Sequence, residues 1–192
     1  MKYCFLALAF CLAMLAQAAS VPFPLADVPI IEAGQGPQFV NGQVIMPKPT
    51  GKLFDVKKYR GKPVIVAMIS MTCGHCVTAI QYLMQLQDAY RDKGLQVVGV
   101  AGDQHASMEL GQWLQRFRPN FPFGYLDKGP FLKLAGEAPD ARPFAPIILF
   151  VDPSGTVRTR LLGNDPEMKS PQEALTSATK GLLAMSTHIV KK

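Results

Sequence analysis

The sequence contains few cysteines, histidines and tryptophans. Four cysteines, three histidines and one tryptophan occur among 192 residues, and two of the cysteines, Cys4 and Cys11, lie in the apolar N-terminal stretch. The other two, Cys73 and Cys76, are too few and too close together to form the disulfide framework of a small secreted domain. A structural zinc site is disfavoured because it needs about four ligands. A c-type haem is disfavoured because Cys76 is followed by Val77 instead of histidine.

The charge is mildly positive and is not concentrated anywhere along the chain. The net charge is +6, and the lysines and arginines are scattered instead of forming a basic run or a patch interleaved with aromatic residues. Such a pattern is typical of an ordinary solvated surface. We therefore expect no nucleic-acid partner, and the sequence indicates no cofactor and no bound metal ion.

Residues 1–19 are predicted to be a secretory signal peptide. Lys2 precedes an apolar run that ends by about Ala16, and small residues follow this run. No later stretch approaches the ~20 apolar residues of a transmembrane helix. We therefore expect an exported protein without a stable membrane span after processing, most simply in the periplasm of a Gram-negative bacterium. Retention of the leader as an uncleaved anchor is the alternative.

The rest of the chain is predicted to be an extended arm followed by one domain. Residues 20–50 are rich in proline and glycine and show no sustained apolar period, so at most short strands are expected there. Residues 51–192 are long enough to bury a single core. Because no additional dimerisation domain is visible, we expect a monomer.

Within the domain, apolar runs of the strand type alternate with segments of helical period. Continuous runs rich in β-branched residues predict strands buried on both faces, and helical spacing follows two of them. The predicted strands are 62–69, 95–100, 123–126, 146–151 and 156–162, and the predicted helical segments are 77–93, 107–117, 131–136 and 171–190. This order predicts an α/β fold with a central mixed sheet and helices on both faces.

The segment Cys73-Gly74-His75-Cys76 lies between the first predicted strand and the first predicted helix. A helix N-terminus has unsatisfied N–H groups and partial positive charge, which would stabilise a thiolate on Cys73. The spacing would let Cys76 attack a mixed disulfide on Cys73 and expel the product. His75 would add positive charge and favour the reduced form, making the protein more oxidising. The alternative for His75 is an exposed loop residue of little effect.

Three segments together resemble the periplasmic thioredoxin-like (TlpA-type) family: residues 57–66, 73–76 and 144–155. The resemblance spans about residues 50–165. It implies a thioredoxin-like fold and a thiol–disulfide oxidoreductase that acts on exported protein thiols and disulfides and depends on a redox partner protein. It also implies a cis Ala145–Pro146 bond facing the Cys73–Cys76 disulfide. A substrate's extended chain would then pair with the backbone of Ala145, in a groove shared with Thr72 and Gly74.

The sequence departs from this family around the dithiol. Ser70-Met71-Thr72 replace the aromatic residues usual before the first cysteine. No acidic residue near Ala67 or Ala79 matches the buried proton relay of thioredoxins. The proton-transfer route and the direction of electron flow are therefore open at this point.

Two other functions on the same fold are alternatives. A copper-delivery protein would use both cysteines and soft ligands such as Met46, Met68 or Met71, although ordinary packing explains these methionines better. A thiol peroxidase would carry a proline where Val66 stands and a hydroxyl residue where Ser70 stands, so it matches only in part.

Overall fold

The computed structural model describes residues 23–24, 26, 30–32, 38–40, 43–45 and 53–189. The predicted signal peptide, residues 1–19, lies outside the described residues. The described parts of the arm form short strands, namely β1 (Phe23–Pro24), β2 (Ile30–Glu32), β3 (Gln38–Val40) and β4 (Gln43–Ile45). β3 and β4 pair with each other, whereas β1 and β2 join the main sheet.

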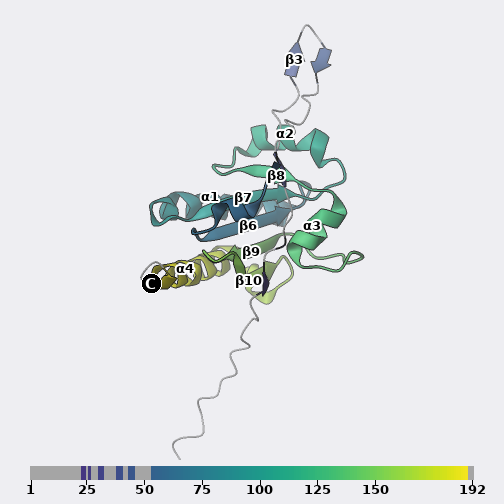
Figure 1. Ribbon diagram of the computed structural model, residues 1–192. Coiled ribbons are helices and arrows are strands. Elements are labelled where there is room, and N and C mark those ends of the chain that lie inside the picture. The colour runs from purple at the N-terminus through teal and green to yellow at the C-terminus, as the bar shows by residue number, and fades with distance from the viewer. Residues whose placement is uncertain are drawn as a thin grey trace, which may run out of the picture.

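One mixed sheet forms the centre of the described structure (Figure 1). Its other strands are β5 (Leu53–Phe54), β6 (Val64–Ile69), β7 (Gln96–Ala101), β8 (Phe123–Tyr125), β9 (Ile147–Val151) and β10 (Thr156–Leu162). The strand order is β1-β10-β9-β6-β7-β8-β2-β5. β6, β7 and β8 are parallel, and β9 is antiparallel to both β6 and β10. The predicted mixed sheet is thus confirmed.

The helices follow the predicted order. They are α1 (Gly74–Tyr90), α2 (Ala106–Phe117), α3 (Lys128–Ala135) and α4 (Pro171–Ile189), with one-turn 3-10 helices η1 (Val56–Tyr59), η2 (Arg91–Lys93) and η3 (Pro166–Lys169). α3 begins at Lys128, three residues before the predicted helical turn. Pro130 obscured this start, but it lies in the first turn, where a missing N–H costs no hydrogen bond.

The central strand β6 is buried on both faces, as predicted. Ile65, Ala67 and Ile69 belong to a core cluster that also contains buried residues of α1, α2 and α4. Val64, Val66 and Met68 belong to a second cluster, which contains Leu134 and Ala135 of α3. Alternate residues of a strand point to opposite faces, so the two clusters lie on opposite sides of the sheet. Helices therefore cover both faces.

Strand register brings three distant segments to one edge of the sheet. Ile69 at the end of β6 is level with Ala101 at the end of β7, and Met68 is level with Ile147 at the start of β9. The loop before α1, the loop after β7 and the segment preceding β9 therefore meet there. In α/β sheets, such an edge at the carboxyl ends of parallel strands is a common location for functional sites.

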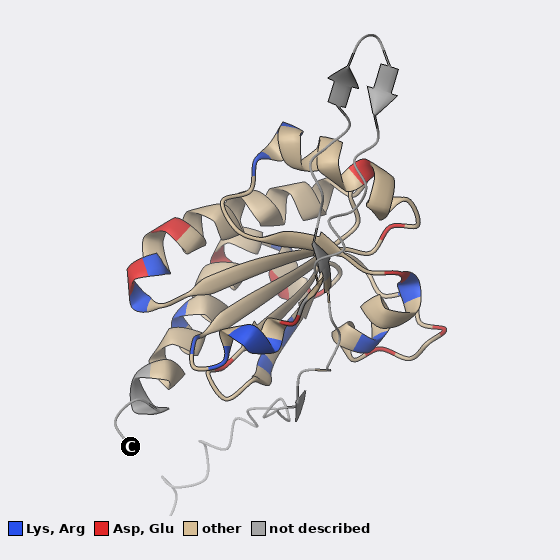
Figure 2. Cartoon of the chain, turned by 45° about the horizontal axis from the view of Figure 1, so that its top comes forward, with Lys and Arg blue, Asp and Glu red and all other residues tan. Residues whose placement is uncertain are grey.

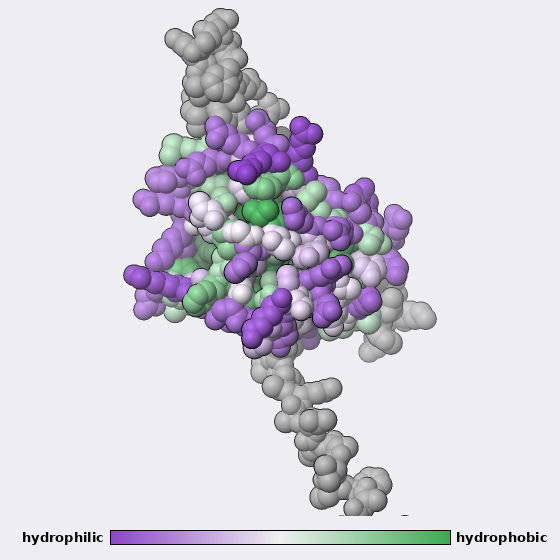
Figure 3. All heavy atoms as spheres, turned by 180° about the vertical axis from the view of Figure 1, so that it is seen from behind, coloured by the Kyte–Doolittle hydropathy of each residue, from purple (hydrophilic) through white to green (hydrophobic). Residues whose placement is uncertain are grey.

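Charged residues are spread over the described part of the chain. Lysine, arginine and acidic residues are distributed over helix ends and loops of the described chain (Figure 2). On the face seen in Figure 3, hydrophilic and apolar side chains are interspersed. None of the helices within the described ranges is both long enough and apolar enough to cross a membrane.

Candidate active site

Cys73 is the N-cap residue of α1 and has an extended backbone conformation. Its sulfur accepts a hydrogen bond from the backbone N–H of Cys76 at 3.3 Å. The same N–H also donates to the Cys73 backbone oxygen at 3.1 Å, so it is shared between the two acceptors. The Cys73 thiol also lies 3.8 Å from the backbone oxygen of Ala145, to which it donates. The Cys73 side chain is partly accessible, so its sulfur can meet another molecule.

Cys76 is fully buried, with 0% of its surface exposed, and it packs among the apolar residues of α1. Burial raises the pKa of its thiol far above the ordinary value, and the hydrogen bond with Cys73 raises it further. A backbone hydrogen bond from Ser70 acts in the opposite direction. Cys76 is therefore a neutral thiol at neutral pH. The two sulfurs are not bonded to each other in this structure.

The Ala145–Pro146 peptide bond is cis, as the family resemblance implies. Gly163, just after β10, packs directly behind this bond. Its backbone N–H donates to the Phe144 oxygen at 3.1 Å. A Cβ atom at position 163 would come within 2.6 Å of the Ala145 carbonyl carbon. Gly163 thus lets two backbone segments approach each other closely and supports the loop that contacts Cys73.

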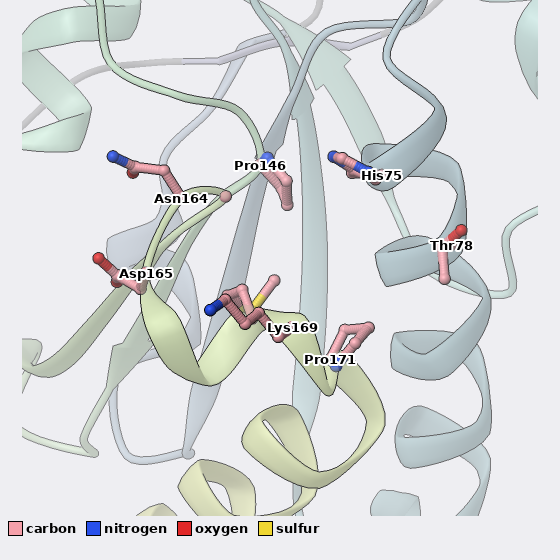
Figure 4. Close-up of a pocket in the computed structure, with 9 residues that line it drawn as sticks. His75, Thr78, Pro146, Asn164, Asp165, Lys169 and Pro171 are labelled. Atoms are coloured by element: carbon pink, nitrogen blue, oxygen red, sulfur yellow. The ribbon is translucent and has the colours of Figure 1, made fainter.

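A pocket of about 390 Å³ opens beside this loop. Figure 4 shows His75 and Thr78 of α1 on one side, Asn164, Asp165 and Lys169 on the other, and Pro146 between them. Gly163, Met168 and Pro171 complete the lining. The structure therefore places the predicted residues His75 and Pro146 in one cavity. Thr72 and Gly74, also predicted for the groove, are exposed on either side of Cys73.

Phe144 is a residue at this site that sequence reasoning did not single out. Its side chain is 64% exposed, which is unusual for a large aromatic ring, and it directly precedes Ala145. Its position before the predicted cis-proline was the available signal, because residues there flank any groove at the dithiol. The sequence alone did not indicate that the ring would face solvent.

Asp103 is the second residue that sequence reasoning missed. Its carboxylate accepts hydrogen bonds from the Ser70 hydroxyl at 2.7 Å and from the Met71 backbone N–H at 2.8 Å. The available signal was its position just after β7, since the ends of neighbouring parallel strands meet at one sheet edge. An acidic residue therefore lies at the loop before the dithiol. It comes from the segment after β7 and not from β6 or α1.

The residues named for the alternative functions are dispersed. Met68 packs in the cluster on the opposite face of the sheet from Cys76, whereas Met71 packs beside the cluster of Cys76. Met46 lies outside the described residues. Across the part of the chain that the structure describes, no three histidine, cysteine or acidic side chains are grouped as metal ligands. Val66, where a peroxidase would carry proline, is a ladder residue of β6 paired with Val98 and Leu149.

Comparison with known proteins identifies the family. The family model described as Redoxin matches residues 32–176. The chain belongs to the Redoxin family. The match includes the dithiol, the cis-proline and all of the central strands, so the site described above lies within the part of the molecule that this redoxin shares with its family.

One curated relative has a name that describes thiol chemistry, and another matches this chain over only a short segment. The redoxin is 22% identical over 113 residues to thiol-disulfide oxidoreductase ResA of Bacillus thuringiensis subsp. konkukian, which is 59% of this chain and 62% of ResA. It is 36% identical over 58 residues to protein DipZ of Mycobacterium bovis, covering 30% of this chain and 8% of DipZ. The redoxin therefore spans less than two thirds of the length of either relative.

Solved structures establish the fold. A crystal structure from Chlorobium tepidum, assigned as thiol:disulfide interchange protein DsbE, superposes with a TM-score of 0.64 at 22% identity, covering 84% of the redoxin and 96% of that chain. A thioredoxin family protein from Chlorobium tepidum TLS gives a TM-score of 0.56 at 18% identity, covering 82% and 98%. The thioredoxin-like fold expected from the sequence is confirmed.

Proposed function

We propose that this redoxin is a thiol–disulfide oxidoreductase that exchanges disulfides with exported proteins. The observation that carries the proposal is the contrast between the two cysteines. Cys73 is accessible, caps a helix and accepts an N–H hydrogen bond on its sulfur, whereas Cys76 is buried one helical turn away. Such an asymmetric pair suits one attacking and one resolving thiol. The name of the relative ResA supports the same chemistry.

In the first step, the Cys73 thiolate attacks one sulfur of a substrate disulfide. A Cys73–substrate disulfide forms, the substrate S–S bond breaks, and the departing substrate sulfur leaves as a thiolate that takes up a proton. The Cys76 N–H and the helix N-terminus favour negative charge on the attacking sulfur. The accessible position of Cys73 lets a protein-sized substrate reach it.

In the second step, Cys76 loses its proton and attacks the Cys73 sulfur. The Cys73–Cys76 disulfide forms, the bond to the substrate breaks, and the second substrate thiolate leaves. The substrate disulfide is reduced to two thiols and the enzyme dithiol is oxidised by two electrons. The reverse sequence oxidises a substrate dithiol. Either direction needs a redox partner protein that restores the starting state of the pair, and the reduction potential of the couple selects the direction.

The groove beside the dithiol would hold the substrate chain. The Ala145 carbonyl already faces the Cys73 sulfur at 3.8 Å. An extended substrate segment could pair with the backbone of Ala145 while its neighbouring side chain enters the pocket next to Pro146. Thr72 and Gly74 would flank the reacting sulfur. His75, on the wall of the same pocket, would place positive charge near Cys73 when protonated and would favour the reduced form.

Export to the periplasm of a Gram-negative bacterium is part of the proposal. It is supported by the signal peptide predicted at residues 1–19 and by the presence of only one cysteine pair after it. A disulfide-exchanging dithiol also suits a compartment in which disulfides persist. Fractionation of cells that express the full chain tests this part independently of the chemistry.

Turnover of oxidised insulin or an oxidised peptide by the wild type, Cys73→Ala and Cys76→Ala tests the activity. We expect both substitutions to abolish multiple turnover, with Cys76→Ala still reacting once. Asp92→Asn removes an exposed carboxylate in η2, past the end of α1 opposite to Cys73, and serves as the control. Full turnover by Cys73→Ala would contradict the assigned roles. Stoichiometric Cu(I) binding with negligible exchange by the wild type would favour the copper-delivery alternative instead.

A further inference from the structure

The loop between β6 and α1 is held by contacts from the segment after β7. The Gly102 backbone N–H donates to the Ile69 oxygen at 3.1 Å, which extends the parallel ladder by one bond. Beyond it, the Asp103 carboxylate receives the Ser70 hydroxyl on one oxygen and the Met71 N–H on the other. Both oxygens of the half-buried carboxylate thus accept hydrogen bonds, from two consecutive residues of the same loop.

One of these two residues, Ser70, connects directly to Cys73. The Ser70 carbonyl accepts a hydrogen bond from the Cys73 N–H at 3.2 Å. Ser70 therefore contacts the attacking residue through its carbonyl group. Its backbone also acts to lower the pKa of the buried Cys76 thiol. A displacement of Ser70 would move the contact with Cys73.

We propose that Asp103 is a positioning residue for the dithiol. Its carboxylate fixes Ser70 and Met71, and the hydrogen bond between Ser70 and Cys73 then fixes Cys73 as the N-cap of α1. This inference rests on the proposed oxidoreductase function, because it concerns the reactivity of the same two cysteines. Asp103 acts through the loop and does not touch the reacting sulfurs or the substrate.

The negative charge of Asp103 does not itself favour ionisation of the dithiol. A nearby carboxylate disfavours ionisation of a thiol, and Asp103 acts in this direction on Cys76. Two roles can therefore be separated by substitution. Asparagine keeps an oxygen for the Met71 N–H and an amide that can donate to the Ser70 hydroxyl, but it has no charge and cannot accept a proton. Alanine removes both hydrogen bonds and the charge.

The experiment measures the rate at which iodoacetamide alkylates Cys73 at pH 7 in the reduced protein, with the modified cysteine identified by peptide mapping. We expect Asp103→Ala to lower this rate roughly tenfold, the usual consequence of losing hydrogen bonds to a charged acceptor. Asp103→Asn should stay within about twofold of the wild type. Ser70→Ala, which removes one of the two bonds, should fall between them. Asp92→Asn and Asp92→Ala, at the opposite end of α1, are the controls for loss of a carboxylate elsewhere.

Alkylation of the buried Cys76 reports any variant that has unfolded, and Ser70→Ala is the milder test if Asp103→Ala does not fold. A rate for Asp103→Ala and Ser70→Ala equal to that of the wild type would overturn the positioning role. So would an equal loss in Asp103→Asn and Asp103→Ala, because it would assign the effect to charge or to proton acceptance. These outcomes are distinct from failure of the proposed function, in which the wild type itself has no exchange activity.

Discussion

Replacing Gly163 by alanine should damage the site without touching either cysteine. The new Cβ atom would lie 2.6 Å from the Ala145 carbonyl carbon, closer still to its oxygen, and 3.0 Å from Cδ of Pro146. The obstacles in front of it are backbone and a proline ring, which cannot rotate away as a flexible side chain would. The Ala145–Pro146 segment must therefore move away from Gly163 by roughly 1 Å.

The consequences follow from the same geometry. Overpacking of this kind costs about 1–3 kcal/mol of folding stability. Ala145 is also the residue whose oxygen faces the Cys73 sulfur at 3.8 Å. A shift of about 1 Å next to reacting atoms can reduce a rate roughly 100-fold. We therefore expect Gly163→Ala to lose both stability and most of its turnover of a protein disulfide.

Urea unfolding and disulfide turnover measure the two effects. Gly181→Ala is the matched control, because a Cβ atom at this exposed position of α4 meets nothing within 4 Å. A helical glycine replaced by alanine should gain about 0.5–1 kcal/mol and leave turnover unchanged. The reasoning is refuted if Gly163→Ala unfolds at the same urea concentration as the wild type and turns over substrate at the same rate.

Three further predictions concern single residues. Because burial raises the pKa of Cys76, native reduced protein should be alkylated only at Cys73 between pH 7 and about 8.5. The stability of the folded protein should fall above about pH 8.5, where the Cys76 thiol ionises only in the unfolded chain. Equal labelling of both cysteines, or the same decline of stability in Cys76→Ala, would refute this reasoning. Phe144→Ala should raise KM for a protein disulfide several-fold and leave turnover of a small disulfide unchanged, because an exposed ring beside the groove can contact only a large substrate; equal losses on both substrates would count against it. Burial alone would raise the pKa of Asp152, but hydrogen bonds from Ser154 and Thr156 and the Arg158 guanidinium lower it. Asp152→Asn should therefore lower the free energy of unfolding by about 3 kcal/mol at pH 7, and by progressively less as the pH falls below about 4. A pH-independent difference in urea unfolding would show that the charge is not responsible.

Local sequence patterns were sufficient to predict the elements that form the core. The continuous apolar runs at β6 and β7 are typical of strands that are buried on both faces, and both strands are observed. Gly94 ends the first helical segment in a left-handed conformation with φ of 83°, as a C-cap glycine does. The position of the dithiol at the start of α1 follows from the same local patterns, because the order of strand, tight loop and helix leaves Cys73 at the N-cap position.

Features that depend on tertiary proximity were not predictable from these patterns. Asp103 is 30 residues from Cys73 in sequence, and only the parallel register of β6 and β7 brings its carboxylate to the loop. Gly163 looks like any loop glycine until the Ala145–Pro146 bond is seen against it. Lys169 and Asn164 reach the pocket for the same reason, since β10 and η3 return the chain to the dithiol edge.

The most direct test of the central claim is mass spectrometry of Cys76→Ala after incubation with an oxidised protein substrate. Removal of the buried resolving thiol should leave the first intermediate intact, so we expect a covalent complex joined by a disulfide that peptide mapping assigns to Cys73. Cys73→Ala, which retains Cys76, should form no such complex. Absence of a complex with Cys76→Ala, or an equal yield through Cys76 in Cys73→Ala, would contradict the account.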